Sequence, residues 1–522
     1  MAAKVILYGI DGGTESALAP LMRAGRLPNL ASLSARGCRA ALESTVPWHS
    51  APAWSSMSTG ALPGKHGVFN FFEMQPDLRN LPLPPGAVRA EKIWHALNRR
   101  GLSAGVVNVP VTYPAEPLDG FMISGLPGPG EDVFPPERKQ TISEIGRWLD
   151  SKSELRDGYF IEPRREVNAR IRMDGDRARA ALEFAGSQPD FLMYVFSSTD
   201  ELQHRMWHSW DTSHPANARC DPAWEPQAIP QAYEAADAGL ATLLRAFGGP
   251  ETTVFAVSDH GFGPARWIFF PNRLLAEWGW LSPGGPEASD PLAPDPNYSP
   301  SKLGFDPRRT RAFMGPALVG PFAEIFINVK GRNPHGTVAP GAEYESARDE
   351  LARRFLEWQD PLTGYRPAAK AHKRESIFSG PRMESAPDLL IECAPGCRTM
   401  ADVSKFPPLI ESAPWHVPTK AQTGTHIRDG IFIAAGPVIR AGVSFDKFRI
   451  TDIMPTILHC YGLPIPENLD GRVLTEIFTQ EFMDSHPVRY EAAGKQSNGQ
   501  ARLDAEDAAA MTRRLEGLGY FT

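Results

Sequence analysis

The chain has 522 residues, 42% of them hydrophobic, and its 54 Lys and Arg against 61 Asp and Glu give a formal net charge of −7. A chain of that length is too long to fold around one small hydrophobic core. It predicts one large α/β domain with insertions, or two to three domains. The acidic balance argues against a general nucleic-acid binder or a protein that binds anionic membranes, because both partners are negatively charged.

The N-terminus and the cysteines favour a cytoplasmic protein. The first residues run directly into an apolar strand pattern, without the basic and apolar regions of a secretory signal. No apolar run reaches the ~20 residues that a membrane-spanning helix needs. The five cysteines are scattered and odd in number, which fits a reducing compartment. We therefore expect a cytoplasmic protein with no membrane partner.

The first half of the chain alternates strand-like apolar runs with helical patterns. This alternation predicts a mostly parallel central sheet with helices on both faces. Residues 110–129 are rich in Pro and Gly and are expected to form a loop. The predicted strands are 4–10, 40–46, 103–109, 191–196 and 252–257, and the predicted helices are 16–25, 30–37, 90–100, 142–155, 166–185 and 231–247.

The pattern loosens after residue 263 and resumes near residue 387. Residues 264–386, with a helix at 343–359, are interpreted as an insertion or cap over the ligand-binding edge of the sheet. Strands are expected again at 388–392 and 430–435, with a loop at 421–426 and a helix at 453–461. The predicted units are a catalytic α/β core at 1–263, the cap at 264–386, the rest of the core at 387–480 and a polar helical C-terminal tail at 481–522, in which an exposed helix spans 501–518.

A hydroxyl group lies at a predicted strand-to-helix turn. Ser50 follows the strand pattern at 40–46, and a helix is expected to begin near Pro52. Backbone N–H groups at a helix N-terminus favour anions, so a serine there could attack phosphorus. A plain helix N-cap is the alternative interpretation of Ser50.

Acidic and imidazole groups follow several predicted strands. Asp11 ends the first strand, where open α/β sheets bind their ligands, although an Asx turn would also explain it. Asp200 and His204 are four residues apart and would lie on one face of a helix. Asp259 and His260 end another strand.

His426 precedes the strand expected at 430–435 and completes a set of three carboxylates, three imidazoles and one hydroxyl. Mixed nitrogen and oxygen ligands of this kind suit zinc, or manganese, in an open catalytic site. Each residue by itself could instead cap a helix or form hydrogen bonds within a loop.

The order of the motifs resembles the alkaline-phosphatase superfamily, and most of all its nucleotide pyrophosphatase/phosphodiesterase and predicted phosphohydrolase/phosphomutase branch. The matching motifs run from residue 4 to about 475 and include VILYGIDGG, SAPAWSSMSTGALPGKHGVFNF, DELQH, VSDHGFG and TGTHIRDGIFIAAGP. The resemblance implies an alkaline-phosphatase-like α/β fold with an inserted cap. It also implies a metal-dependent hydrolase of phosphoric ester or phosphoanhydride bonds.

The resemblance further implies two divalent ions, with zinc as the first choice and manganese as the alternative. In that family the residue at the position of Ser50 is the nucleophile, which forms a covalent intermediate. Asn70 lies one residue from the position of an asparagine that contacts the phosphoryl oxygen, and it is a candidate substrate-binding residue. One ion would be held by Asp11, Ser50, Asp259 and His260, and the other by Asp200, His204 and His426.

Other activities remain open at this stage. A phosphodiesterase or nucleotide pyrophosphatase acting on a small phosphoester or nucleotide is the first choice, and a phosphomonoesterase or phosphomutase is the second. A sulfatase is disfavoured because Trp54 replaces the arginine of the pattern Cys/Ser-x-Pro-x-Arg. A non-catalytic metal-binding protein is the remaining alternative. Candidate cations for the extra charge of a monoester are Lys65, Arg205, Arg266 and Lys420.

Overall fold

The structure is a computed structural model. It describes residues 4–78, 80–128, 132–145, 155–156, 159–160, 163–184, 188–284, 305–315, 320–401, 410–412, 422–492 and 505–517. No helix within these ranges is long and apolar enough to cross a membrane.

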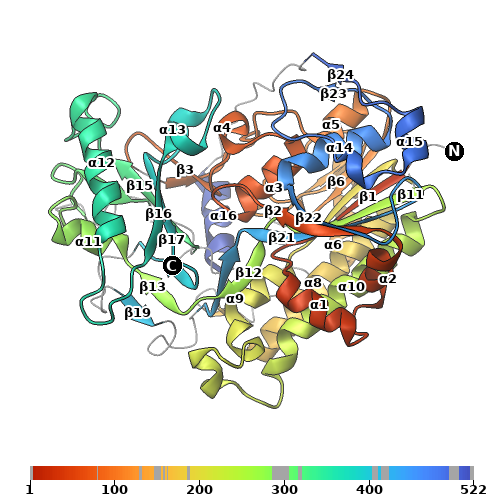
Figure 1. Cartoon of the computed structure of the whole chain (residues 1–522), viewed down its shortest axis with the longest axis horizontal. Coiled ribbons are helices and arrows are strands. Elements are labelled where there is room, and N and C mark those ends of the chain that lie inside the picture. The colour runs from red at the N-terminus through yellow and green to blue at the C-terminus, as the bar shows by residue number, and fades with distance from the viewer. Residues whose placement is uncertain are drawn as a thin grey trace.

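A nine-stranded sheet forms the centre of the molecule (Figure 1). Five neighbouring strands, from β11 to β6, run parallel, and β7, β21 and β2 add antiparallel pairs. This arrangement confirms the predicted mostly parallel α/β fold. In sheet order the strands are β22 (Val443–Arg449), β2 (Cys38–Glu43), β21 (Asp429–Ala435), β11 (Thr252–Val257), β1 (Lys4–Ile10), β10 (Phe191–Phe196), β5 (Ala104–Val107), β6 (Gly120–Ile123) and β7 (Val133–Phe134).

Helices bury both faces of this sheet, which explains why its central strands are almost continuously apolar. Ile6, Tyr8 and Ile10 of β1 belong to the core on one face, and Val5 and Leu7 belong to the core on the other. The first core includes side chains of α1 (Glu15–Arg23), α2 (Pro28–Arg36), α8 (Pro163–Phe184), α9 (Ser198–Trp210) and α10 (Ala228–Phe247). The second includes side chains of α3 (Ser50–Thr59), α5 (Ile93–Asn98) and α14 (Ile453–Cys460).

The region predicted as a cap builds a separate four-stranded sheet with its own core, to the left of the central sheet in Figure 1. Its strands are β14 (Ala312–Met314), β15 (Phe322–Ile327), β17 (Leu389–Cys393) and β16 (Ala368–Lys373), and helix α12 (Ala342–Glu357) packs against them. The strand expected to return the chain to the core at 388–392 is therefore β17 of the second sheet. A buried strand has the same apolar pattern in either sheet, so the sequence periodicity could not show to which sheet this strand belongs.

Three further local predictions were wrong. Strand β6 lies inside the segment expected to be a loop, and β20 (Gly424–Ile427) replaces the loop expected at 421–426. Helix α3 begins at Ser50 rather than near Pro52, since a proline is tolerated in the first helical turn. The helix expected at 142–155 begins as α6 (Lys139–Ile145), and its continuation to residue 154 falls outside the described residues.

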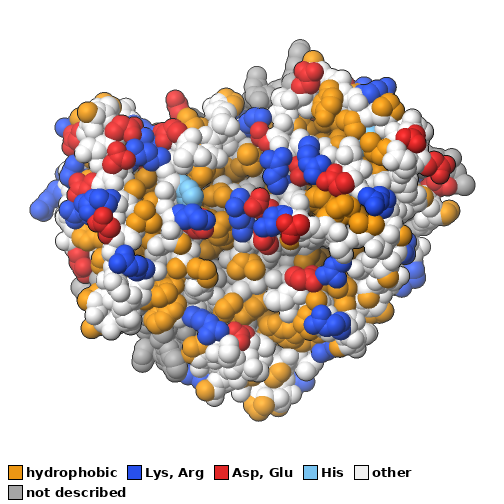
Figure 2. Space-filling model, in the orientation of Figure 1, with side chains coloured by type: hydrophobic (Ala, Val, Ile, Leu, Met, Phe, Trp, Pro, Cys, Tyr) orange, Lys and Arg blue, Asp and Glu red, His pale blue; other side chains and the backbone are white. Residues whose placement is uncertain are grey.

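The C-terminal helix α16 (Ala505–Gly517) forms within the predicted range, but it is not exposed. Met511, Thr512 and Leu515 are all buried. Leu515 joins an apolar cluster with Ala51 and Phe71, so the helix is seated against the core, in the seam between core and cap (Figure 1). On the face shown in Figure 2, positive and negative side chains are interspersed rather than gathered by sign.

Candidate metal centre and nucleophile

The predicted site residues converge at the carboxyl edge of three neighbouring parallel strands. Asp11 follows β1, Asp200 lies in α9 directly after β10, and Asp259 and His260 follow β11. Because these strands run parallel and adjacent, their ends bring the side chains together although the chain separates them by up to 249 positions. His426 enters from β20, which pairs with β12 (Gly261–Pro264) immediately after His260.

Four of these residues form one group around the Ser50 hydroxyl. The Oγ of Ser50 lies 3.3 Å from Oδ1 of Asp11 and 3.3 Å from Nε2 of His260. The Nε2 of His260 is 3.1 Å from Oδ2 of Asp259. Ligand atoms of Asp11, Asp259 and His260 all lie within 4.8 Å of one another, close enough to share one ion.

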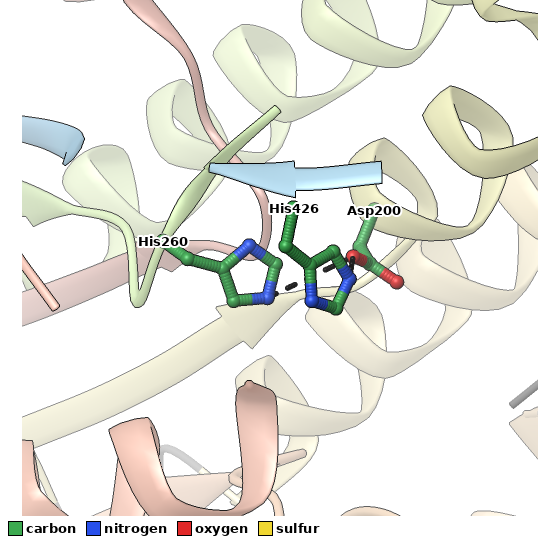
Figure 3. Close-up of side chains that lie close together, drawn as sticks. All are labelled: Asp200, His260 and His426. Carbon is green, nitrogen blue, oxygen red and sulfur yellow. Dashed lines mark ion pairs between the residues drawn. The ribbon is translucent and has the colours of Figure 1, made fainter. Parts of the chain in front are cut away.

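The remaining three residues form a second group beside the first. The Nε2 of His426 lies 3.1 Å from Oδ1 of Asp200 and 2.8 Å from Nε2 of His204. The Nε2 of His204 is 3.6 Å from Oδ1 of Asp200. His260 connects the groups, because its Nε2 is 3.9 Å from the same Asp200 oxygen. Figure 3 shows the side chains of Asp200, His260 and His426 close together.

Backbone carbonyls fix the tautomer of all three imidazoles. The Nδ1 of His204 is 3.3 Å from the carbonyl of Gly424, and that of His426 is 3.3 Å from the carbonyl of Trp48. The Nδ1 of His260 is 3.1 Å from the carbonyl of Gly261. A carbonyl can only accept, so each Nδ1 donates and each Nε2 directs a lone pair into the cluster.

The carboxylates perturb one another in this buried setting. Burial raises the pKa of Asp11 well above its ordinary value, and the charges of Asp259 and Asp200 raise it further. Burial also raises the pKa of Asp259 to about 7. Despite burial, the pKa of Asp200 is lowered, because His204 and His426 lie beside it.

The donor set fits divalent cations. Three buried carboxylates and three imidazole lone pairs face a common space, and the two Nε2 atoms of His204 and His426 approach each other closely. Without a cation between them, such groups repel and lose hydration. Oxygen and neutral imidazole nitrogen are ligands that zinc and manganese accept.

Trp54 supports the cluster from within helix α3, a role that the sequence analysis missed. Its Nε1 donates to Oδ2 of Asp11 at 2.9 Å, which leaves Oδ1 to face Ser50. Gly9 makes room for the indole, because a Cβ at this position would overlap the ring. The four-residue spacing of Ser50 and Trp54 would have been a signal only if the helix had been predicted to begin at Ser50, since residues so spaced share a helix face.

We expect Trp54→Phe to weaken metal affinity by about tenfold to a hundredfold, the usual effect of removing a hydrogen bond to a ligand. The phenyl ring keeps most of the apolar packing but cannot donate to Asp11. Equilibrium metal titration by calorimetry would measure the change. Trp94→Phe is the matched control, because Trp94 is an equally buried tryptophan of the same core whose Nε1 has no hydrogen-bond partner among the described residues. Equal affinities for both variants would contradict the support role.

Asn70 lies in a pocket between the core and the cap. Trp48, His49, Asn70 and Glu324 are among the residues that line this small cavity of about 20 Å³. The Nδ2 of Asn70 donates to Oε1 of Glu324 at 3.0 Å, and its Oδ1 accepts from the backbone N–H of Phe71 at 2.7 Å. Burial raises the pKa of Glu324 to about 7. Strand β15 of the cap sheet thus places a carboxyl group near His49, the residue before Ser50.

Three of the four cations predicted as extra phosphate contacts are bound to carboxylates elsewhere, and Lys420 falls outside the described residues. Lys65 pairs with Asp470 at 2.7 Å. Arg205 pairs with Glu166 at 3.1 Å, and Arg266 pairs with Asp211 at 3.1 Å. These three cations are thus engaged by carboxylates of the chain itself.

Comparison with known proteins identifies the family of the chain and proteins of similar fold. The sequence model of the family described as "Type I phosphodiesterase / nucleotide pyrophosphatase" matches residues 5–426. No significant match was found among curated proteins.

Solved structures of two kinds share the fold. Murine ectonucleotide pyrophosphatase / phosphodiesterase 5, solved as an inactive variant in complex with AMP, superposes with a TM-score of 0.54 at 14% identity, covering 91% of this chain and 100% of that one. Its human counterpart gives a TM-score of 0.52 at 14% identity, with the same coverage. Phosphonoacetate hydrolase from Sinorhizobium meliloti, in complex with phosphonoacetate, gives 0.50 at 16% identity, covering 87% of this chain and 94% of that one.

Proposed function

Because the chain belongs to the type I phosphodiesterase / nucleotide pyrophosphatase family, we propose that it is a metal-dependent phosphoryl-ester hydrolase in which Ser50 is the nucleophile. One observation carries this proposal. The Ser50 hydroxyl is fully buried, begins helix α3 and lies 3.3 Å from both a carboxylate and an imidazole of the cluster. A serine in that position is held next to the groups that would bind a phosphoryl oxygen.

The proposed metal centre takes both groups of side chains. When bound, divalent ions would supply Lewis acidity that stabilises charge on phosphoryl oxygens and lowers the pKa of a hydroxyl group or water. The donor set supports zinc first and manganese as the alternative. One ion would be held by Asp11, Ser50, Asp259 and His260, and the other by Asp200, His204 and His426.

The residues of the chain perform the proposed reaction as follows. The Ser50 oxygen attacks phosphorus and forms a new O–P bond, while the bond from phosphorus to the leaving oxygen breaks. The hydroxyl of Ser50, oriented by its hydrogen bond to Oδ1 of Asp11, gives up its proton to solvent, and the leaving oxygen takes one up. Water then hydrolyses the phosphorylated serine. Asn70, whose amide is fixed by Glu324 and Phe71, is proposed to donate its second Nδ2 hydrogen to a phosphoryl oxygen.

A phosphodiester is the proposed substrate class, ahead of a monoester. Supporting this preference, Lys65, Arg205 and Arg266 are engaged with carboxylates rather than with the site. A monoester carries a second charge on the reacting phosphorus, which these cations were predicted to neutralise.

We therefore expect the protein, supplied with zinc or manganese, to hydrolyse bis-p-nitrophenyl phosphate with a kcat/KM at least about tenfold above that for p-nitrophenyl phosphate, as the loss of one charge-assisted contact implies. Initial rates followed at 400 nm or so would measure both. A preference for the monoester would favour the phosphomonoesterase or phosphomutase alternative. Bound metal without turnover of either ester would favour a non-catalytic metal-binding protein.

A further inference from the structure

Strand β15 of the cap sheet is held against the segment that leads to the nucleophile. Phe322 and Glu324 are two residues apart on this strand, so their side chains lie on the same face. The ring of Phe322 packs edge-on against that of Trp48, with the ring centroids 4.3 Å apart. Trp48 is joined in turn to His426, because its Nε1 lies 3.3 Å from the carbonyl oxygen of His426. The cap strand is thereby fixed relative to the ion cluster.

Asn70 lies on a loop that packs against both neighbours of the nucleophile. The ring of Phe71, the residue after Asn70, has its centroid 5.4 Å from that of His49. Phe71 also shares an apolar cluster with Ala51. Because His49 and Ala51 flank Ser50 in the chain, the loop that carries Asn70 is packed around the start of helix α3.

Glu324 brings a carboxyl group from the cap to the Asn70 amide. Its Oε1 accepts a hydrogen bond from Nδ2 of Asn70, while Oδ1 of Asn70 accepts from the backbone N–H of Phe71. These two bonds fix the orientation of the amide, and the second hydrogen of Nδ2 is left for a ligand. Asn70 and Glu324 both line two small cavities of about 20 Å³ each, so the carboxyl group borders open space between core and cap.

The carboxyl group of Glu324 is not paired with a cation in the part of the chain that the structure describes, where Asn70 is its hydrogen-bond partner. The other titratable side chains that line the two cavities are His49 and Glu73. Burial raises the pKa of Glu324 to about 7, and the hydrogen bond from Asn70 offsets only part of this rise. Glu324 therefore changes from neutral to anionic close to neutral pH.

We propose that Glu324 is a specificity-determining residue, which orients Asn70 toward the phosphoryl group and, as an anion, discriminates against phosphoryl groups that carry two negative charges. This inference rests on the proposed function, because it takes Asn70 as a phosphoryl contact beside Ser50. A phosphodiester carries one charge and a monoester carries two, so a nearby carboxylate repels the monoester more strongly. The substrate class is therefore a phosphoryl group with a single charge, that of a phosphodiester or a phosphonate monoester.

The test compares p-nitrophenyl phosphate with methyl p-nitrophenyl phosphate, using the metal-loaded protein. The two esters share one leaving group, and the methyl group removes one charge from the phosphoryl group. At about pH 8, where Glu324 is mostly ionised, we expect wild type to have the higher kcat/KM for the methyl ester. In Glu324→Gln this preference should shrink by about tenfold to a hundredfold, because each ester loses a repulsion proportional to its own charge.

The pH dependence separates this role from a structural one. The difference in preference between wild type and Glu324→Gln should grow as the pH rises through about 7, because only wild type ionises at this position. Glutamine keeps the orientation of Asn70, since its side-chain oxygen also accepts a hydrogen bond. Glu392→Gln is the control and should behave as wild type, because Glu392 lies on the neighbouring strand β17 and pairs with Lys370 at 2.9 Å.

A second neutral variant tests the orienting role. Glu324→Met removes both the charge and the acceptor for Asn70, so the preference should shrink as in Glu324→Gln while both esters react more slowly than in that variant. An unchanged preference in both neutral variants at every pH, or a gain or loss that is equal for the two esters, would overturn the inference and leave Glu324 a structural residue.

Failure of the proposed function would be visible separately. If wild type turned over neither ester, the hydrolase proposal would fail, while calorimetric binding of both esters to wild type and Glu324→Gln would still decide the inference. A gain in affinity of Glu324→Gln for the doubly charged ester that exceeds its gain for the methyl ester would support it. The same ratio of the two affinities in both proteins would refute it.

Discussion

Replacing Ser50 with alanine is expected to reduce kcat by at least about a thousandfold, the scale seen when an enzyme loses its nucleophile. The substitution removes the hydroxyl oxygen that is proposed to form the covalent intermediate. It leaves Asp11, Asp259 and His260 in position, so the metal content measured by mass spectrometry should stay near that of wild type. Rapid quenching of wild type followed by peptide mass spectrometry should locate the added phosphoryl mass on Ser50.

Two variants make this result specific. Ser55→Ala removes another buried hydroxyl from the same helix, one whose Oγ has no hydrogen-bond partner among the described residues, and it should leave turnover near normal. Ser50→Thr keeps the hydroxyl and should retain at least about a tenth of the activity, since one added methyl in a packed site usually has a modest cost. Near-native turnover by Ser50→Ala would eliminate the covalent route.

The parts of the site that follow strand ends could be predicted from the sequence. Asp11, Asp200 and Asp259 each follow a continuous apolar run, and parallel adjacency then dictates that they meet. Local spacing added His204, which shares a helix face with Asp200. His426 was included as a histidine that precedes the strand expected at 430–435. The pairing of β20 with β12 that brings it close could not be predicted, because it is a contact between distant segments.

The residues that were missed depend on tertiary packing. The indole of Trp54 bonds to Asp11 only because Gly9 leaves space beneath the sheet. Glu324 reaches Asn70 because the cap sheet lies against the core, and no local pattern encodes that docking. Helix α16 looked polar and exposed because its buried face is narrow, made of a few residues such as Met511 and Leu515. Periodicity identifies such a helix but not the surface it covers.

Removing the bound ions is expected to abolish turnover and to lower thermal stability. The three carboxylate and three imidazole ligands would then face one another without a compensating charge. An ion at a thousand times its dissociation constant stabilises the folded state by about 4 kcal/mol, so the chelated protein should unfold several degrees earlier. Calorimetric scans with and without chelator, followed by restoration with zinc or manganese, would measure both effects.

A matched pair of variants on α9 distinguishes ligand loss from general damage. His204→Ala removes a proposed ligand and should lower the metal content toward one ion per chain. His208→Ala, one turn further along, changes a histidine that bonds to Thr423 and Glu225 outside the cluster, and it should keep both ions. Equal metal contents for the two variants would contradict the assignment of His204.

The stability of the chelated protein should also fall as the pH rises from about 6.5 to about 8. Burial raises the pKa of Asp259 to about 7 and that of Asp11 well above its ordinary value, so both hold protons in the folded state that the unfolded chain releases. Unfolding therefore releases protons. The free energy of unfolding falls by at most about 1.4 kcal/mol for each pH unit and each of the two carboxyl groups.

The imidazoles limit this effect to the upper part of the pH range. Burial lowers the pKa of His204 to about 3 and that of His260 well below its ordinary value, so below about pH 6.5 the unfolded chain takes up protons that the folded state does not. This proton uptake on unfolding opposes, at low pH, the proton release from Asp11 and Asp259. It stops above the pKa of histidine in the unfolded chain, where those side chains are neutral. Bound cations keep the carboxylates deprotonated, so the free energy of unfolding of the metal-loaded protein should not fall over this pH range. Parallel plots of the free energy of unfolding against pH for the chelated and the metal-loaded protein would refute a carboxylate-lined ion site.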